Sequence, residues 1–266
     1  MIEVTLNNVS KSFDLPGGGK THALKAVSVT LVPGEFTVLV GPNGSGKTTL
    51  LNLLAGSIES DTGEIRARID GRDLNWLQLS GRARSRHVVW IHQNSAAGSV
   101  NDLDVEENMR LAALRGVTLP WRRAVDRNWR RHVAQMLDGT RLAGKARATA
   151  DDLSLGQRQL LALELAAVRN GQLILLDEPT ASLDRASAAL CIARADALAR
   201  EAHASTVLVT HDLALAAGFG DRLLVMQDGR IAHDLSGPSK QALTPEVLFK
   251  LCQFDRAPAV GYESGN

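Results

Sequence analysis

Residues 41–48 read GPNGSGKT and fit the pattern G-x-x-x-x-G-K-[ST] in full. The glycines permit a tight turn whose backbone amides point at phosphate oxygens, and the helix expected next adds the positive end of its dipole. Lys47 would supply a positive charge to the β- and γ-phosphates, and the Thr48 hydroxyl would ligate Mg²⁺. A glycine turn that binds nothing is the alternative, but it gives no reason for the lysine. The expected nucleotide contacts are Gly41, Asn43, Gly44, Ser45, Gly46, Lys47, Thr48 and Thr49.

A second pair of reactive side chains follows the apolar run 173–176. Asp177 and Glu178 come directly after this run, at the end of a strand where α/β sheets bind their ligands. Asp177 would hold Mg²⁺ through a water molecule, and Glu178 would accept a proton from the attacking water or polarise it. A solvated pair of loop acids is the alternative, and the complete phosphate loop upstream argues against it.

The elements that must position these residues alternate between short apolar runs and helical patterns. This alternation predicts an α/β fold with a mostly parallel sheet covered on both faces. Strands are expected at 2–6, 26–31, 36–40, 88–91, 173–176 and 206–209, with a hairpin of 223–226 and 230–232 around Asp228-Gly229. Helices are expected at 47–55, 104–115, 122–138, 157–169, 185–201 and 212–217. The all-helical middle of the chain interrupts the alternation and indicates an inserted subdomain.

The composition excludes several protein classes. The 266 residues carry 30 Lys and Arg against 29 Asp and Glu, and a nucleic-acid-binding domain would need a stronger basic bias. No apolar run approaches the roughly 18 residues of a membrane span, and no signal peptide is expected. Cys191 and Cys252 match no metal-ligand spacing and favour a reducing compartment. Residues 115–147 hold nine basic and two acidic residues, which indicates a solvated helical surface or a contact with a partner or acidic lipid.

Five further motifs occur in order along the chain. They are Phe13 near the first strand, Gln93 after 88–91, LSLGQ at 153–157, ASLD at 181–184, and His211 within Thr210-His211-Asp212. With the phosphate loop and the strand-end acids, they make the chain resemble the ATP-binding subunits of ABC transporters over nearly all of residues 1–255. The resemblance implies a P-loop NTPase core with an N-terminal antiparallel β-subdomain and an inserted α-helical subdomain. It also implies one domain over 2–255, with the core at 1–92 and 171–232, the helical subdomain at 93–170, and a flexible tail at 255–266.

The resemblance implies a composite site between two head-to-tail cassettes. Each ATP would lie between the phosphate loop of one chain and the signature motif of the other. In that arrangement Ser154, Gly156, Gln157 and Asp184 act in trans, while Phe13 stacks on adenine in cis. Glu178, His211 and Gln93 would be the catalytic residues, and Thr48, Gln93 and Asp177 would hold Mg²⁺. ATP would close the dimer and hydrolysis would release it, which drives an attached membrane subunit.

The implied protein is an ATPase with ATP and Mg²⁺ as ligands, peripheral at the cytoplasmic face of the inner (plasma) membrane. Its implied partners are a second cassette that we expect to be identical, integral membrane permease subunits and a periplasmic substrate-binding protein, with no nucleic acid. Residues 92–108 and the basic insert with Trp121 and Trp129 are similar to a bacterial importer subgroup often labelled for tryptophan or tyrosine. Import of amino acids or other small solutes is therefore the expected function.

Other functions stay open at this point. An exporter or lipoprotein-releasing cassette is the first alternative. A soluble ABC-type ATPase acting on DNA or ribosomes is less favoured, because the segment between Lys47 and Asp177 is too short for a long coiled coil and the chain holds one cassette. An unrelated kinase or GTPase would not explain Ser154, residues 182–184 and His211 together.

One residue departs from the family pattern, and several others have ordinary structural explanations. The usual signature has glycine where this chain has Leu155. Leucine would cost about 1 kcal/mol or more if the position needs a positive φ, and nothing if it is helical, so we expect hydrolysis to be retained at the same or a lower rate. Phe13 could be a core residue, Gln93 a surface residue, His211 a capping or core histidine, and Ser154 an ordinary helix cap.

Overall fold

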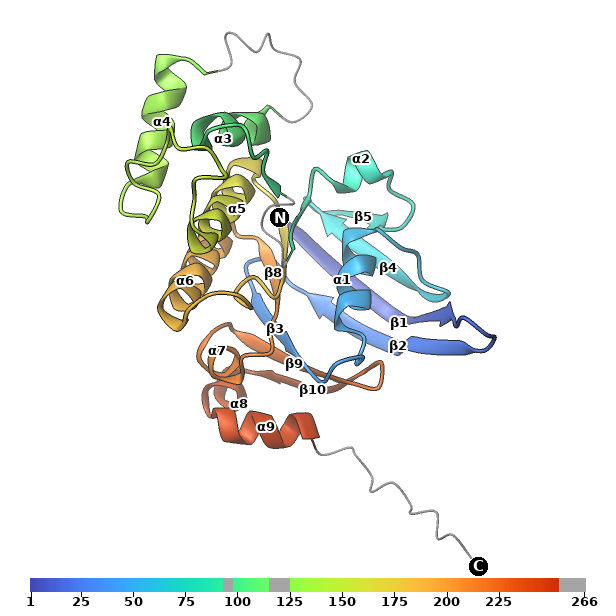
Figure 1. Ribbon diagram of the computed structural model, residues 1–266. Helices are drawn as coiled ribbons and strands as arrows, with labels where there is room; N and C mark the ends of the chain where they lie inside the picture. The colour runs from blue at the N-terminus through green and yellow to red at the C-terminus, as the bar shows by residue number, and fades with distance from the viewer. Residues whose placement is uncertain (93–97, 115–124, 254–266) are drawn as a thin grey trace, which may run out of the picture.

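The computed structural model describes residues 1–92, 98–114 and 125–253 (Figure 1). Gln93, the start of the helix expected at 122–138, and the tail expected at 255–266 lie outside the described residues. Two sheets organise the rest, one antiparallel and one mostly parallel, so the predicted fold class is confirmed. No helix of the described residues has the length and apolar character that crossing a membrane requires.

The antiparallel sheet has the order β2-β1-β4-β5 and the larger sheet the order β10-β9-β3-β8-β7-β6. In the larger sheet only β10 runs antiparallel to its neighbour. The strands are β1 (Ile2–Asp14), β2 (Lys20–Leu31), β3 (Phe36–Val40), β4 (Thr62–Ile69), β5 (Arg72–Asn75), β6 (Val88–Ile91), β7 (Leu173–Asp177), β8 (Ser205–Val209), β9 (Arg222–Gln227) and β10 (Arg230–Ser236). The helices are α1 (Lys47–Ala55), α2 (Gly81–Arg84), α3 (Val105–Ala113), α4 (Arg127–Leu137), α5 (Leu155–Arg169), α6 (Arg185–Glu201), α7 (Leu213–Gly218), α8 (Gly237–Gln241) and α9 (Pro245–Gln253).

The central strands of the larger sheet, β3, β7 and β8, are buried on both faces because both faces are covered. In β7, Leu173 and Leu175 pack toward α1 and the antiparallel sheet, whereas Ile174 and Leu176 pack toward the helices on the other face. A strand buried on both sides reads as a continuous apolar run, which explains why these strands were predictable. Because β3, β7 and β8 run parallel, their carboxyl ends meet at one edge of the sheet.

Several elements differ from the sequence-based expectation. Strands β4 and β5 and helices α2, α8 and α9 were missed, and β1 and β2 are longer than expected because they continue as a hairpin beyond the core. Strand β5 is exposed throughout, so it carries no apolar pattern to detect. The helix expected at 122–138 begins at Arg127, because Asp126 caps it by accepting a hydrogen bond from the Trp129 amide at 2.8 Å.

A buried ion pair joins α5 to α6. Both oxygens of Glu164, which is fully buried, accept hydrogen bonds from the guanidinium of Arg194 at 2.7 and 2.9 Å. Removing the arginine alone leaves a buried carboxylate without its charge partner. We expect Arg194→Ala to lower the free energy of unfolding by about 3 kcal/mol or more.

Urea unfolding followed by circular dichroism measures this loss. Arg200→Ala is the matched control, because its ion pair with Asp196 lies at the surface and should contribute less than about 1 kcal/mol. Equal losses in the two variants would contradict the expectation.

Candidate nucleotide site

The phosphate loop is built so tightly that two of its glycines have no substitute. A Cβ at Gly41 would lie 2.1 Å from the carbonyl oxygen of Met226 on β9. Gly46 has a φ of +102°, and a Cβ there would lie 2.4 Å from the carbonyl oxygen of Ala23 on β2. The loop is therefore clamped between β2 and β9 before α1 begins at Lys47.

The Lys47 ammonium lies back over its own loop. Its Nζ donates hydrogen bonds to the carbonyl oxygens of Gly41 at 2.9 Å and Pro42 at 3.0 Å. Burial lowers the pKa of Lys47, and the charges of Glu178 and Asp177 oppose this effect. The Lys47 side chain thus lies over the loop and interacts electrostatically with the two acids.

The loop also suits a phosphate group because it contains a hydrogen-bond donor without a partner in the described part of the chain. The Ser45 hydroxyl is buried and has no hydrogen-bond partner among the described residues. A Cβ at Gly44 would meet nothing within 4 Å, so that side of the loop is open. An unpaired buried hydroxyl is costly, and a bound phosphate oxygen would satisfy it.

Glu178 and His211 meet at the ends of two neighbouring strands. Strands β7 and β8 are parallel with Asp177 opposite Val209, which brings the residues after them together. The Nε2 atom of His211 lies 2.7 Å from Oε1 of Glu178. Glu178 has a φ of 49° and its amide donates to the Val209 carbonyl at 3.0 Å, so this residue is held in the left-handed region at a cost of about 1–2 kcal/mol. His211 is exposed, which rules out the core explanation, and Asp212, not His211, caps α7.

Asp177 is half-buried beside Glu178. Burial and the charge of Glu178 raise the pKa of the Asp177 carboxyl, and the charges of His92, Lys47 and His211 act against this rise. His92 is a neighbour that the sequence-based site omitted. Its ring stacks on Trp90 with centroids 4.2 Å apart. Because His92 directly follows β6, the strand beside β7, its position in the sequence could have predicted that it lies near Asp177.

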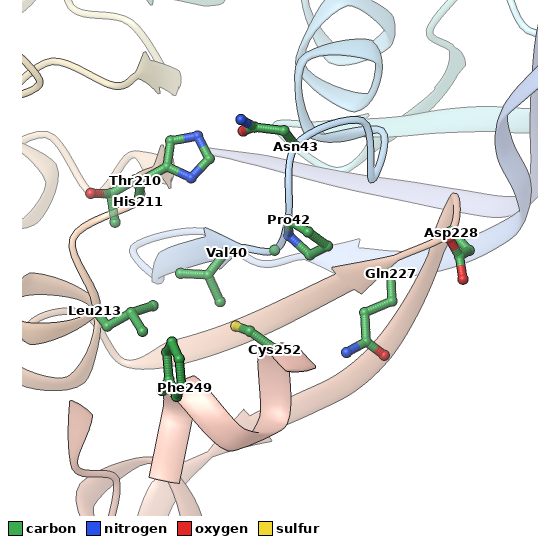
Figure 2. Close-up of a pocket in the computed structure, with 11 residues that line it drawn as sticks. Val40, Pro42, Asn43, Thr210, His211, Leu213, Gln227, Asp228, Phe249 and Cys252 are labelled. Atoms are coloured by element: carbon green, nitrogen blue, oxygen red, sulfur yellow. The ribbon is translucent and has the colours of Figure 1, made fainter. Parts of the chain in front are cut away.

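A cavity of about 610 Å³ opens beside the phosphate loop (Figure 2). It is lined by the loop, by His211 and by the end of β9, and Phe249 and Cys252 of α9 form its remaining wall. Neither α9 residue was expected at the site. Phe13 is 40% exposed on β1, so the core explanation for it is wrong, and it is not among the residues that line this cavity.

The signature segment forms a capped helix start. The Ser154 hydroxyl accepts from the Gln157 amide at 3.3 Å, and the Gln157 side chain accepts from the Ser154 amide at 3.0 Å. Leu155 is the first residue of α5 and is 45% exposed. Its backbone is helical and does not have a positive φ, so leucine costs nothing at this position. A Cβ at Gly156 would meet its nearest neighbour, Ser187, at 3.5 Å, so packing within the chain does not require glycine there.

Arg141 ties this helix start to α6. Its guanidinium donates to the Ser187 hydroxyl at 2.8 Å, and its carbonyl accepts from the Gln157 side chain at 3.3 Å. Ser187 in turn donates through its hydroxyl and its amide to the carboxylate of Asp184, which caps α6. The four residues expected to act in trans, Ser154, Gly156, Gln157 and Asp184, therefore form one surface joined through Arg141 and Ser187.

Comparison with known proteins decides the family. A model of the family described as ABC transporter matches residues 24–181. The chain belongs to the ABC transporter family. This cassette is 31% identical to a tyrosine transport ATP-binding protein of Clostridioides difficile, over 94% of this chain and 98% of the relative. It is 37% identical to a phosphonates import ATP-binding protein of Burkholderia pseudomallei, over 94% of this chain and 80% of the relative.

A solved structure agrees. The cassette is similar to a dimeric ATP-binding cassette in a post-hydrolysis state with ADP and Pi bound, with a TM-score of 0.70 and 25% identity over 88% of this chain and 98% of that chain. The likeness to ATP-binding subunits that include one named for tyrosine transport and one named for phosphonates import is thus confirmed. ABC cassettes are ATP-binding proteins of the ATPase class.

Proposed function

We propose that this cassette binds and hydrolyses Mg-ATP to energise a bacterial importer of amino acids or other small solutes. The observation that carries the ATPase function is the meeting of Lys47, Asp177, Glu178 and His211 around the buried loop. The relative named for phosphonates import supports the direction, and the relative named for tyrosine transport supports the class of cargo.

Each residue at this edge has a distinct role in the proposed reaction. The amides of 41–48 and the Lys47 ammonium bind the β- and γ-phosphates, and Ser45 donates its free hydroxyl. Thr48, Asp177 and Gln93 would hold Mg²⁺, which supplies charge neutralisation on the phosphates. Glu178 accepts a proton from the attacking water, and His211 fixes the carboxylate that does so.

A second, identical chain completes the site in this proposal. Ser154, Gly156, Gln157 and Asp184 of one chain would contact the nucleotide on the other, while Phe13 would stack on adenine in cis. The absence of a packing need for glycine at 156 within the described residues, where a Cβ would meet Ser187 at an ordinary 3.5 Å, and the dimeric form of the similar cassette support this arrangement. One domain over 2–255, with a helical subdomain at 93–170, would associate with membrane permease subunits at the cytoplasmic face and work with a periplasmic binding protein.

Nucleotide binding to the purified chain tests the ATPase proposal. Lys47→Ala should weaken Mg-ATP binding by about 100-fold or more, because the buried cation would be lost from a site that neutralises phosphate charge. Lys145→Ala is the control, since Lys145 is exposed in the loop between α4 and α5. Equal affinities in the two variants would contradict the proposed site. A binding-protein gene beside this gene would support import, and an exporter permease gene there would contradict it.

Arg141 offers a test of the trans surface. We expect Arg141→Met to lower the ATP turnover rate about three- to tenfold and to leave nucleotide affinity of the monomer unchanged, because it cuts the link from α5 to Ser187. Arg141→Lys should recover part of the rate, since an ammonium can still donate to Ser187.

Steady-state turnover and fluorescent-nucleotide titration measure the two quantities. Arg131→Met is the control on the exposed face of α4. An unchanged turnover rate in Arg141→Met, whether or not its nucleotide affinity falls, would overturn the role of Arg141 in the trans surface.

A further inference from the structure

Helix α9 places an aromatic side chain at the edge of the nucleotide site. Phe249 is 51% exposed, and it lines the 610 Å³ cavity together with Leu213 of α7 and Cys252 (Figure 2). The opposite wall of this cavity is Pro42 and Asn43 of the phosphate loop. A half-exposed phenylalanine at such a wall is apolar surface that the single chain leaves in contact with water.

The rest of α9 holds this side chain in place. Leu248 is fully buried, and the Gln227 side chain donates to the Leu251 carbonyl at 2.7 Å, which anchors the helix to β9. Phe249 is therefore presented by a fixed element and not by a loose end. Aromatic residues held in this way are the usual energetic anchors of protein interfaces.

We propose that α9 extends the interface between two copies of this chain, with Phe249 and Leu213 covered by the second copy when ATP closes the dimer. The inference rests on the proposed function, since it uses the ATP-driven dimer.

The second copy is favoured as the occupant for three reasons. The cavity is also lined by Asn43 and His211, which lie on the edge where the second chain would close over the nucleotide. The similar cassette of known structure is dimeric. Helices α3 and α4 lie at the end of the molecule away from α9, so a membrane subunit bound to the helical region would leave α9 free (Figure 1). In a twofold dimer each chain contributes its own Phe249, so the interface contains this contact twice.

Labelling of the Cys252 thiol, in the same wall of the cavity, can report whether the cavity is covered. The chain has two cysteines, and Cys191 is 1% exposed with a pKa that burial raises to about 12, which makes its thiol unreactive. Cys252 is half-buried in the cavity, so a maleimide should label this thiol alone. The rate of Cys252 labelling then measures directly whether the cavity is covered.

The test uses the full chain carrying Glu178→Gln, which should hold ATP without hydrolysing it. We expect Mg-ATP to convert this protein to a dimer in sedimentation and to slow labelling of Cys252 at least tenfold. The protection must increase with protein concentration, because shielding by bound nucleotide alone would not depend on it. Adding Phe249→Ser should raise the dimer dissociation constant, measured at saturating Mg-ATP, about tenfold or more. Leu111→Ser, which removes a 46% exposed leucine of α3, should leave the dimer as it was.

The outcomes separate this inference from the proposed function. If the chain does not bind Mg-ATP, the proposed function fails. If it binds Mg-ATP and dimerises, but Phe249→Ser dimerises equally well or Cys252 labels equally fast in the dimer, the role of α9 is overturned and the ATPase function stands. A chain that binds Mg-ATP and stays monomeric at all concentrations also overturns the role of α9.

Discussion

Glu178→Gln will lower the ATP turnover rate by about 10²–10⁴-fold and leave the affinity for Mg-ATP within a few fold of the wild-type value. The glutamine keeps the shape of the side chain and its contact with His211, but it cannot accept a proton from water. Binding should survive because Lys47 and the loop amides, not Glu178, contact the phosphates in the proposed site. Turnover is measured as phosphate release under saturating Mg-ATP, and affinity by equilibrium titration.

Two controls make the result specific to Glu178. Glu59→Gln changes an exposed glutamate outside the nucleotide site and should turn over ATP at the wild-type rate. His211→Ala should reduce turnover by a smaller factor than Glu178→Gln, because His211 positions the carboxylate and is not the proton acceptor. A Glu178→Gln protein that retains more than about a tenth of the wild-type rate would contradict the role of this carboxylate.

Gly156→Ala will separate folding from function at the signature segment. The methyl group would meet Ser187 at an ordinary distance of 3.5 Å, and alanine favours the helix by up to about 1 kcal/mol over glycine. The variant should therefore unfold at the same or a higher urea concentration. Its ATP turnover should fall about tenfold or more, because in the proposed site the partner's nucleotide approaches the start of α5, where the methyl group is added.

Gly218→Ala is the matched control for this variant. Gly218 is also helical and has nothing within 4 Å of the added Cβ, but it lies in α7 away from the signature segment. It should keep the wild-type turnover rate. If Gly156→Ala turned over ATP as fast as Gly218→Ala, the signature segment would not contact nucleotide closely, and the composite site would be contradicted.

The sequence was sufficient for those parts of the site whose conformation is encoded locally. Residues 41–48 and the run 173–176 predict their own conformation, because a loop that binds phosphate needs its glycines and a strand buried on both faces must be apolar. Glu178 lies beside His211 because parallel neighbouring strands end at the same edge of the sheet.

Other parts of the site depend on contacts between distant segments. Arg141 meets Ser187 across 46 residues, and Phe249 lines the same cavity as the phosphate loop only because α9 packs back on β9. No local pattern encodes either contact. The conformation of Leu155 was open for a related reason: only the cap formed by Ser154 decides that the helix begins there.

The central claim, that this chain is an ATPase whose site is completed by a second copy, is tested most directly by phosphate release from Mg-ATP at increasing concentrations of the wild-type protein. The account predicts that the rate per chain rises with protein concentration to a plateau, and that Lys47→Ala stays at background. Phosphate release no higher than that of Lys47→Ala at every concentration would contradict the claim of an ATPase. A rate per chain that does not change with concentration, down to concentrations at which sedimentation shows only monomer, would contradict the composite site.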